Sequence, residues 1–145
     1  MTRRSLRENV FKALFRMEFS APEEKEEQLH LFLEYAKWYE DEDEDVAKEL
    51  KPLSEKAYEY IYQKTKNIMS RLEEIDGKLK ESSKSWSLER IGKAELTILR
   101  LAAYEILFDE EVPDKVAVNE AVELAKIYCK EGAASFINGV LGSLI

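Results

Sequence analysis

The chain has 145 residues, of which 45% are hydrophobic and 36% are charged, and its formal net charge is −8. This length suits one domain with a sizeable core, and the hydrophobic content excludes wholesale disorder. Five Gly and three Pro are too few for a turn-rich β-sandwich or barrel.

The cysteine count and the length of the apolar runs bear on the cellular compartment. The single cysteine, Cys129, excludes an internal disulfide and a CxxC metal site, and it is typical of a reducing cytoplasm. No apolar run approaches the roughly 18 residues of a membrane span, and the basic first segment has no signal-peptide core. We therefore expect a cytoplasmic protein with no membrane contact.

Charge is unevenly distributed along the chain. Residues 1–16 contain five basic side chains and one acidic side chain, a net of +4. Residues 23–49 contain twelve acids and three lysines, a net of −9. Because binding responds to the local field, such a bipolar molecule can hold an anion at one face and a basic protein at another.

A first helix is predicted over residues 3–19, where apolar residues recur at helical spacing, and Pro22 follows its end. Arg3 and Arg7 are four residues apart and Arg4 lies beside them, so their guanidinium groups can share one exposed edge that suits phosphate. A solvated first turn without a ligand is the alternative interpretation. Cations at a helix N-terminus oppose the macrodipole, which slightly favours a functional reason for them.

A second helix is predicted over residues 26–39, with its apolar residues facing inward. It carries His30, the only histidine, and no surrounding pattern marks a catalytic base, so a surface or rim position is expected. Residues 40–45 are all acidic but lack the spaced pattern of a calcium loop. Like-charge repulsion predicts a solvated linker there.

Residues 53–79 keep a helical period, and the Asp76-Gly77 pair is expected to end or kink this third helix. Residues 80–87 are polar and serine-rich, which predicts a loop. Trp86 is expected to anchor this loop to the core, and Ser87 to N-cap the next helix.

The last third of the chain is the most apolar. Residues 88–107 place a broad apolar stripe along one long helix, and Pro113 then marks a break. A second helix follows and is expected to end at Gly132, before a final helix over residues 136–145. The sequence predicts an all-α fold of three helices, a polar hinge and at least three more helices, with no convincing strand.

Motifs for catalysis are absent from the sequence. It contains no GxGxxG, GxxxxGK[ST], GxSxG or HExxH motif. Glu95 and Glu105 have no partner that would shift their pKa values to those of a catalytic acid–base pair. Gly139 and Gly142 have the G-x-x-G spacing of a phosphate-clamping loop, but their apolar surroundings favour close helix packing. We expect no enzyme activity, no catalytic or metal-binding residues and no cofactor.

Four segments carry a family resemblance that covers nearly the whole chain. The first is RRSLRENVFKALF, which resembles an arginine-rich start with an R-x-x-R-E core and an Ala-Leu-aromatic triplet: Arg4, Arg7 and Glu8, then Ala13, Leu14 and Phe15. The segments LERIGKAELTILRLAAYEIL, VPDKVAVNEAVELAKIY and SFINGVL follow in matching order and spacing. By these blocks the chain is identified as a member of the NusB family of transcription antitermination factors. It departs from the family at Phe15, where Tyr is frequent, and residues 20–80 resemble it little.

The resemblance implies one NusB-like domain over residues 1–145, made of two packed helical subdomains of about 1–80 and 85–145, each around three helices. NusB-type proteins bind the boxA segment of nascent ribosomal RNA together with NusE, a small-subunit ribosomal protein. The resulting complex helps RNA polymerase to read through terminators. The partners implied are therefore boxA RNA, NusE and the RNA polymerase antitermination complex.

Residue roles are implied by the same resemblance. The expected RNA-binding residues are Arg3, Arg4, Arg7, Phe15 and Phe136. The expected NusE-binding residues are Glu95, Arg100 and Lys115, the last in the loop that starts near Val112. Without the family, Phe136 would be assigned to the core, because Phe is often buried.

Two other interpretations stay open. One is a helical accessory domain like the N-terminal part of some RNA cytosine-5 methyltransferases; the length and the missing glycine-rich cofactor loop exclude a free-standing methyltransferase. The other is a self-associating helical protein-interaction module without sequence-specific RNA binding. Some family members form homodimers, and the sequence leaves the oligomeric state of this chain undecided.

Overall fold

The computed structural model describes residues 1–39, 50–82 and 87–145. The chain divides into two compact units, residues 1–67 and residues 68–145. The predicted acidic linker, residues 40–45, and the predicted anchor Trp86 lie outside the described residues. The organisation as one RNA-binding domain with subdomains of about 1–80 and 85–145 stays a prediction.

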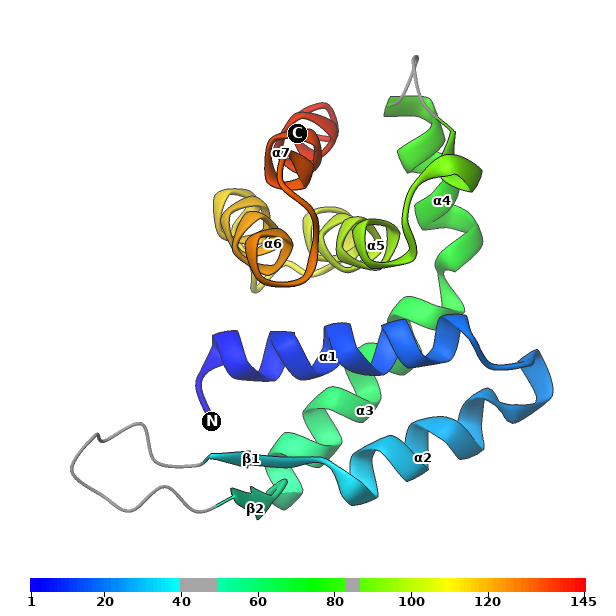
Figure 1. Ribbon diagram of the computed structural model, residues 1–145, viewed down its shortest axis with the longest axis vertical. Coiled ribbons are helices and arrows are strands. Elements are labelled where there is room, and N and C mark those ends of the chain that lie inside the picture. Colours follow the sequence, from blue (N-terminus) through cyan, green and yellow to red (C-terminus); the bar gives the residue numbers. More distant parts are fainter. Residues whose placement is uncertain (40–49, 83–86) are drawn as a thin grey trace. The chain divides into compact units, whose positions relative to one another are not determined.

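The first unit begins with α1 (Arg3–Glu18), which confirms the predicted first helix (Figure 1). Thr2 caps this helix, because its Oγ1 accepts a hydrogen bond from the backbone N–H of Ser5 at 3.1 Å. A short 3-10 turn, η1 (Pro22–Glu24), leads into α2 (Lys25–Tyr35). The helix α3 (Glu55–Ser70) follows later and extends past the boundary between the units.

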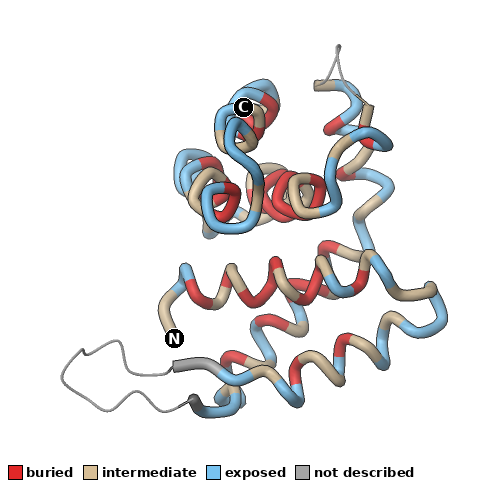
Figure 2. Tube along the Cα trace, viewed as in Figure 1, coloured by how far each residue is buried: buried red, intermediate tan, exposed pale blue. Residues whose placement is uncertain are grey.

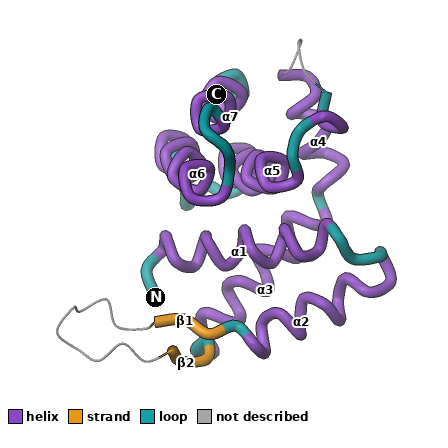
Figure 3. Tube along the Cα trace, in the orientation of Figure 1, coloured by secondary structure: helices purple, strands orange, loops and turns teal. Residues whose placement is uncertain are grey.

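The second helix is shorter than predicted. Ala36 is extended, with φ −65° and ψ 129°, and the chain continues as β1 (Lys37–Tyr39). This strand pairs antiparallel with β2 (Leu50–Pro52), in the register Lys37↔Pro52 (Figure 3). The prediction of a helix to residue 39 is therefore wrong. Aromatic residues favour strands, and a three-residue strand is too short to show an alternating pattern.

The core of the first unit is made mainly of apolar side chains from α1 and α2, which pack against each other (Figure 2). The buried apolar residues of these helices and of α3 within this unit are Val10, Phe11, Ala13, Leu14, Met17, Leu29, Leu33, Ala57 and Ile61. Their spacing is the i, i+3, i+4 pattern of an amphipathic helix, as the sequence predicted.

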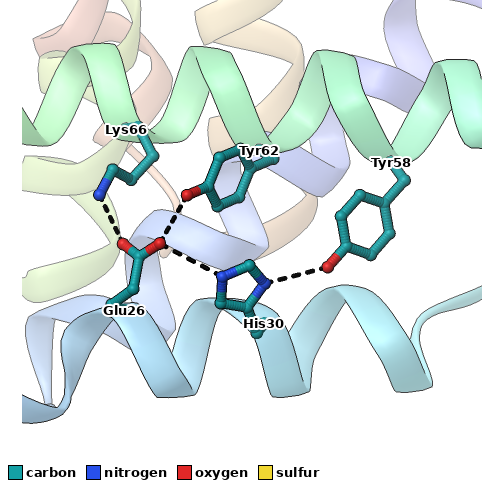
Figure 4. A network of polar contacts seen from close by, with 5 residues as sticks. All are labelled: Glu26, His30, Tyr58, Tyr62 and Lys66. Atoms are coloured by element: carbon teal, nitrogen blue, oxygen red, sulfur yellow. Dashed lines mark hydrogen bonds and ion pairs between the residues drawn. The ribbon is translucent and has the colours of Figure 1, made fainter.

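A polar network on the surface of the first unit links α2 to α3 (Figure 4). The carboxylate of Glu26 pairs with Lys66 Nζ at 2.5 Å, accepts a hydrogen bond from the Tyr62 hydroxyl at 2.5 Å and lies 3.2 Å from His30 Nε2. His30 Nδ1 lies 3.1 Å from the Tyr58 hydroxyl. The hydrogen bonds from Lys66 and Tyr62 lower the pKa of Glu26. Half of the His30 side chain is exposed, which confirms its predicted surface position.

The second unit contains α4 (Leu72–Ser82), the 3-10 turn η2 (Leu88–Arg90), α5 (Lys93–Phe108), α6 (Asp114–Tyr128) and α7 (Ala133–Gly142). The predicted break at Gly77 is wrong, because Gly77 lies inside α4. The helix is interrupted at Arg71 instead, whose N–H donates to the carbonyl of Ile68 three residues back. This tighter i→i−3 bond ends α3 and lets the chain start a new helix.

Local signals placed some of the remaining helix ends and missed others. The Ser87 hydroxyl accepts from the N–H of Glu89 at 3.2 Å and caps η2, and α5 begins only at Lys93. The predicted break at Pro113 is confirmed, since this residue is the N-cap of α6. Gly132 does not end α6: it has φ +92° and is the N-cap of α7.

The helix α5 is the centre of the second unit and packs against α4, α6 and α7. The predicted all-α fold class is confirmed, with β1 and β2 as a short addition that the sequence did not indicate. In the part of the chain that the structure describes, no helix has the length and apolar character needed to cross a membrane.

Candidate functional site

The predicted arginine cluster lies on the first turn of α1. Arg3 and Arg4 are exposed, whereas only 7% of Arg7 is exposed. Arg7 precedes Val10 by three residues and Leu14 by seven, so it continues the buried stripe of the helix. The prediction that Arg7 shares an exposed edge with Arg3 is therefore wrong, and the first turn presents two exposed guanidinium groups.

Phe15 lies in a row of three aromatic rings along α1. Its ring centroid is 6.0 Å from that of Phe11 and 5.1 Å from that of Phe19, against which it packs edge to face. Phe11 is buried, Phe15 is half-buried and Phe19 is 66% exposed. Contact between Phe15 and RNA stays a prediction.

A cavity of about 660 Å³ lies where the chain enters α5 and α7. Phe136, on the first turns of α7, and Glu95, on the first turn of α5, both line it. The other lining residues are Ser87, Arg90, Ile91, Gly92, Lys130, Glu131, Gly132 and Ala133. The structure thus brings together two residues that were predicted to bind different partners.

Electrostatics at the start of α5 explain the position of Glu95. Its carboxylate lies against Gly92, the N-cap of the helix. A Cβ atom at position 92 would collide with this carboxylate. Negative charge is favourable at this helix end, because the macrodipole and the first N–H groups are positive there. Nearby, burial and, to a smaller extent, the charge of Glu95 raise the pKa of Cys129 to about 11.

Two cationic residues of the cavity were not found by sequence reasoning. Arg90 ends the turn η2, Lys130 lies between α6 and α7, and both side chains are exposed. No motif marks them, because each is a single cation in a connecting segment. The two residues are also 40 positions apart in the sequence. Only the contact between α5 and α7 places them around one cavity.

Arg100, predicted to bind NusE, is held inside the second unit. Its Nε donates to Oδ1 of Asp76 at 2.9 Å and its Nη2 donates to Oδ2 at 2.8 Å. The Arg100 and Asp76 side chains are 15% and 22% exposed. This two-bond pair joins α5 to α4, and direct contact of Arg100 with a partner stays a prediction.

Lys115, the third residue predicted for NusE, is exposed on the first turn of α6. The loop before it borders a second, smaller cavity of about 310 Å³ at the end of α5. Acidic Asp109, Glu110 and Asp114 line this cavity together with apolar residues such as Leu107. Its acidic wall suits a basic protein segment.

Comparison with known proteins decides the family. A model of the NusB family matches residues 4–145, which is nearly the whole chain. The chain belongs to the NusB family. The resemblance found in the sequence blocks is therefore confirmed.

Two relatives within the NusB family match over nearly their full length. The chain is 43% identical to the transcription antitermination protein NusB of Lachnoclostridium phytofermentans, covering 100% of this chain and 99% of that protein. It is 40% identical to the protein of the same name from Agathobacter rectalis, covering 97% of each.

Solved structures of NusB proteins share the fold. T. maritima NusB aligns with a TM-score of 0.80 and 34% identity, covering 99% of this chain and 90% of that one. A NusB chain in a crystal structure of antitermination factors NusB and NusE with dsRNA aligns with a TM-score of 0.74 and 25% identity, covering 98% and 94%.

Proposed function

We propose that this protein is a transcription antitermination factor. It binds boxA RNA of ribosomal RNA transcripts together with NusE, and the complex promotes read-through by RNA polymerase. The observation that carries this proposal is the full-length match, at 43% identity, to a transcription antitermination protein NusB. The relative crystallised with NusE and dsRNA supports both partners. The protein acts in the cytoplasm by binding, without a catalytic step.

We propose RNA contacts on each of the two units, considered separately. Arg3 and Arg4 hold phosphate groups, since each exposed guanidinium is a permanent cation with a planar fork of donors. Phe136 stacks on a base inside its cavity, and Phe15 adds aromatic surface on α1. Arg7 supports the first turn from its buried position.

The NusE surface that we propose lies on the second unit. Glu95 and Lys115 contact the partner directly, and Arg100 holds α5 in place through Asp76. The acidic wall at the end of α5, with Asp109, complements a basic protein.

The experiment measures fluorescence anisotropy of a labelled boxA RNA titrated with this protein, with and without NusE, over a series of salt concentrations. Arg3→Ala/Arg4→Ala is the test variant, because both side chains are exposed and their removal spares the core. Lys51→Ala/Lys56→Ala is the matched control, which removes the same charge from exposed positions of the same unit. Two lost phosphate contacts lower the log–log salt slope by about 1.4, at roughly 0.7 per contact for a single strand.

Sequence-preferring binding that tightens with NusE and weakens in the test variant, but not in the control, supports the proposal. Binding that ignores the RNA sequence and persists in Arg3→Ala/Arg4→Ala overturns it. In that case the chain is a helical protein-interaction module, and its mass across a concentration series then reports whether it self-associates.

A further inference from the structure

Negative charge gathers at the C-terminal end of α5. The helix ends at Phe108, and its last turn contains no basic residue. Three acids follow at once: Asp109, Glu110 and Glu111. This end of a helix already carries the negative pole of the macrodipole, so carboxylates placed there oppose it, whereas a cation is favourable. A positive charge that stabilises this helix end must therefore come from another part of the chain.

Arg71 brings such a charge from the junction between α3 and α4. Its guanidinium carbon lies 4.4 Å from the centroid of the Phe108 ring, within the roughly 6 Å over which a ring face attracts a cation. The same guanidinium donates a hydrogen bond from Nη1 to Oε2 of Glu74, on α4, at 3.4 Å. Arg71 and α5 both belong to the second unit. Arg71 thus joins the start of α4 to the end of α5.

Phe108 is also part of the wall of the smaller cavity at the end of α5. Asp109 and Asp114 line the same cavity. Asp109 organises the loop between them, because its Oδ1 accepts a hydrogen bond from the N–H of Glu111 at 3.1 Å and its carbonyl accepts one from the N–H of Val112 at 3.2 Å. Since Asp109 directly follows Phe108, a movement of the ring also displaces this loop and its carboxylates.

We propose that Arg71 is a positioning residue for the NusE surface. By stacking on Phe108, it fixes the end of α5 and with it the acidic loop that a basic partner contacts. Arg71 acts through Phe108 and not by touching the partner. This inference rests on the NusE binding proposed above and adds to it a residue from the α3–α4 junction.

The sign of the effect separates positioning from simple electrostatics. The Arg71 side chain is 47% exposed, so its removal lowers the repulsion that a basic partner meets, and charge alone predicts equal or tighter binding. Loss of the stack on Phe108 predicts the opposite. We expect Arg71→Ala to weaken NusE binding about fivefold, which corresponds to about 1 kcal/mol and lies within the strength of a cation–π contact together with a cation at a helix end.

Titration calorimetry of NusE with each variant measures this effect. Lys78→Ala is the matched control, because Lys78 lies on α4, is 52% exposed and, like Arg71, pairs with a glutamate three residues ahead. This control is expected to bind NusE as tightly as the unmodified protein or slightly more tightly. Arg71→Lys keeps a cation at the ring and is expected to restore part of the affinity that Arg71→Ala loses.

A double-mutant cycle and an NMR signal test the contact with Phe108. Phe108→Leu removes the ring but keeps an apolar side chain at the cavity, and Arg71→Ala/Phe108→Leu is expected to lose no more affinity than the weaker-binding single variant. The ring current of Phe108 should shift the Nε–H proton signal of Arg71 upfield, and Phe108→Leu should abolish this shift. Fully additive losses of affinity, or an unchanged signal, overturn the inference. Circular dichroism checks that each variant is folded.

Three results of the titrations also contradict the inference and show where it fails. If Arg71→Ala binds NusE as tightly as Lys78→Ala does, Arg71 positions nothing and the proposed function stands. If Arg71→Ala weakens binding of boxA RNA without NusE as much as it weakens binding of NusE, the loss is a general one and the positioning role is refuted. If the unmodified protein binds boxA RNA but not NusE, the partner proposed above fails together with this inference.

Discussion

The ion pair between Arg100 and Asp76 gives a sharp prediction about how α4 is held to α5. Two parallel hydrogen bonds of 2.9 and 2.8 Å join side chains that are only 15% and 22% exposed. An exposed ion pair is worth about 0–1 kcal/mol, and breaking a fully buried one costs about 3–5 kcal/mol. For this partly buried pair, we expect Arg100→Ala and Asp76→Ala each to cost about 2–3 kcal/mol of unfolding free energy.

A double-mutant cycle isolates the pair from the other interactions of Arg100. Urea unfolding of both single variants and of Arg100→Ala/Asp76→Ala is expected to give a coupling free energy of about 1–2 kcal/mol. The midpoint temperature of thermal unfolding, Tm, is expected to be about 4–12 °C lower in each single variant, at 2–4 °C per kcal/mol for a chain of this size. Arg100→Lys keeps the positive charge but loses the planar guanidinium that donates two parallel hydrogen bonds. We therefore expect its loss of unfolding free energy to be smaller than that of Arg100→Ala.

Strictly additive losses in this cycle refute the reasoning, because they mean that the two side chains do not stabilise one another. The same variants also test the predicted role in partner binding. If Asp76→Ala weakens NusE binding as much as Arg100→Ala does, Arg100 acts by positioning α5. If only Arg100→Ala weakens binding, at unchanged stability, the guanidinium contacts the partner itself.

Three further predictions concern a thiol, a carboxylate and two glycines. With its pKa raised to about 11, the Cys129 thiol is ionised in only about one molecule in a thousand at pH 8. Iodoacetamide should therefore alkylate it slowly, at a rate that keeps rising above pH 10. An alkylation rate equal to that of a free cysteine contradicts this prediction. The pKa of Glu26 is lowered from 4.5, so its contribution to stability is complete above that pH and is lost as the pH falls through the folded-state value. Urea midpoints of the unmodified protein and Glu26→Gln should therefore differ at pH 7 and approach each other at pH 3, and a difference independent of pH argues against the network. Gly132→Ala is expected to destabilise the protein by about 1–2 kcal/mol, because φ is +92° there. Gly139→Ala, inside α7 with open space around its Cβ, should instead stabilise it by about 0.5–1 kcal/mol, and equal signs for the two glycines would refute the backbone argument.

Features that depend on neighbours in the sequence were determined by the sequence itself. The apolar stripe of α1, the cap at Ser87 and the break at Pro113 each act within a turn or two of helix, so local patterns located them. The family blocks led us to predict binding roles for Phe136 and Glu95, which stay predictions, and the structure places both residues at one cavity. These features needed no knowledge of distant segments.

Tertiary structure decided what lies between segments that are distant in the chain. Residues 37–39 became a strand because a second strand, residues 50–52, pairs with them, and a three-residue strand has no stability by itself. Arg7 carries the same charge as Arg3 and Arg4 yet is buried, since exposure depends on what packs against each face of a helix. Arg90 and Lys130 meet around Phe136 only because α7 packs on α5. A local pattern records which residues are present, and the packing of helices determines which of their side chains share one site.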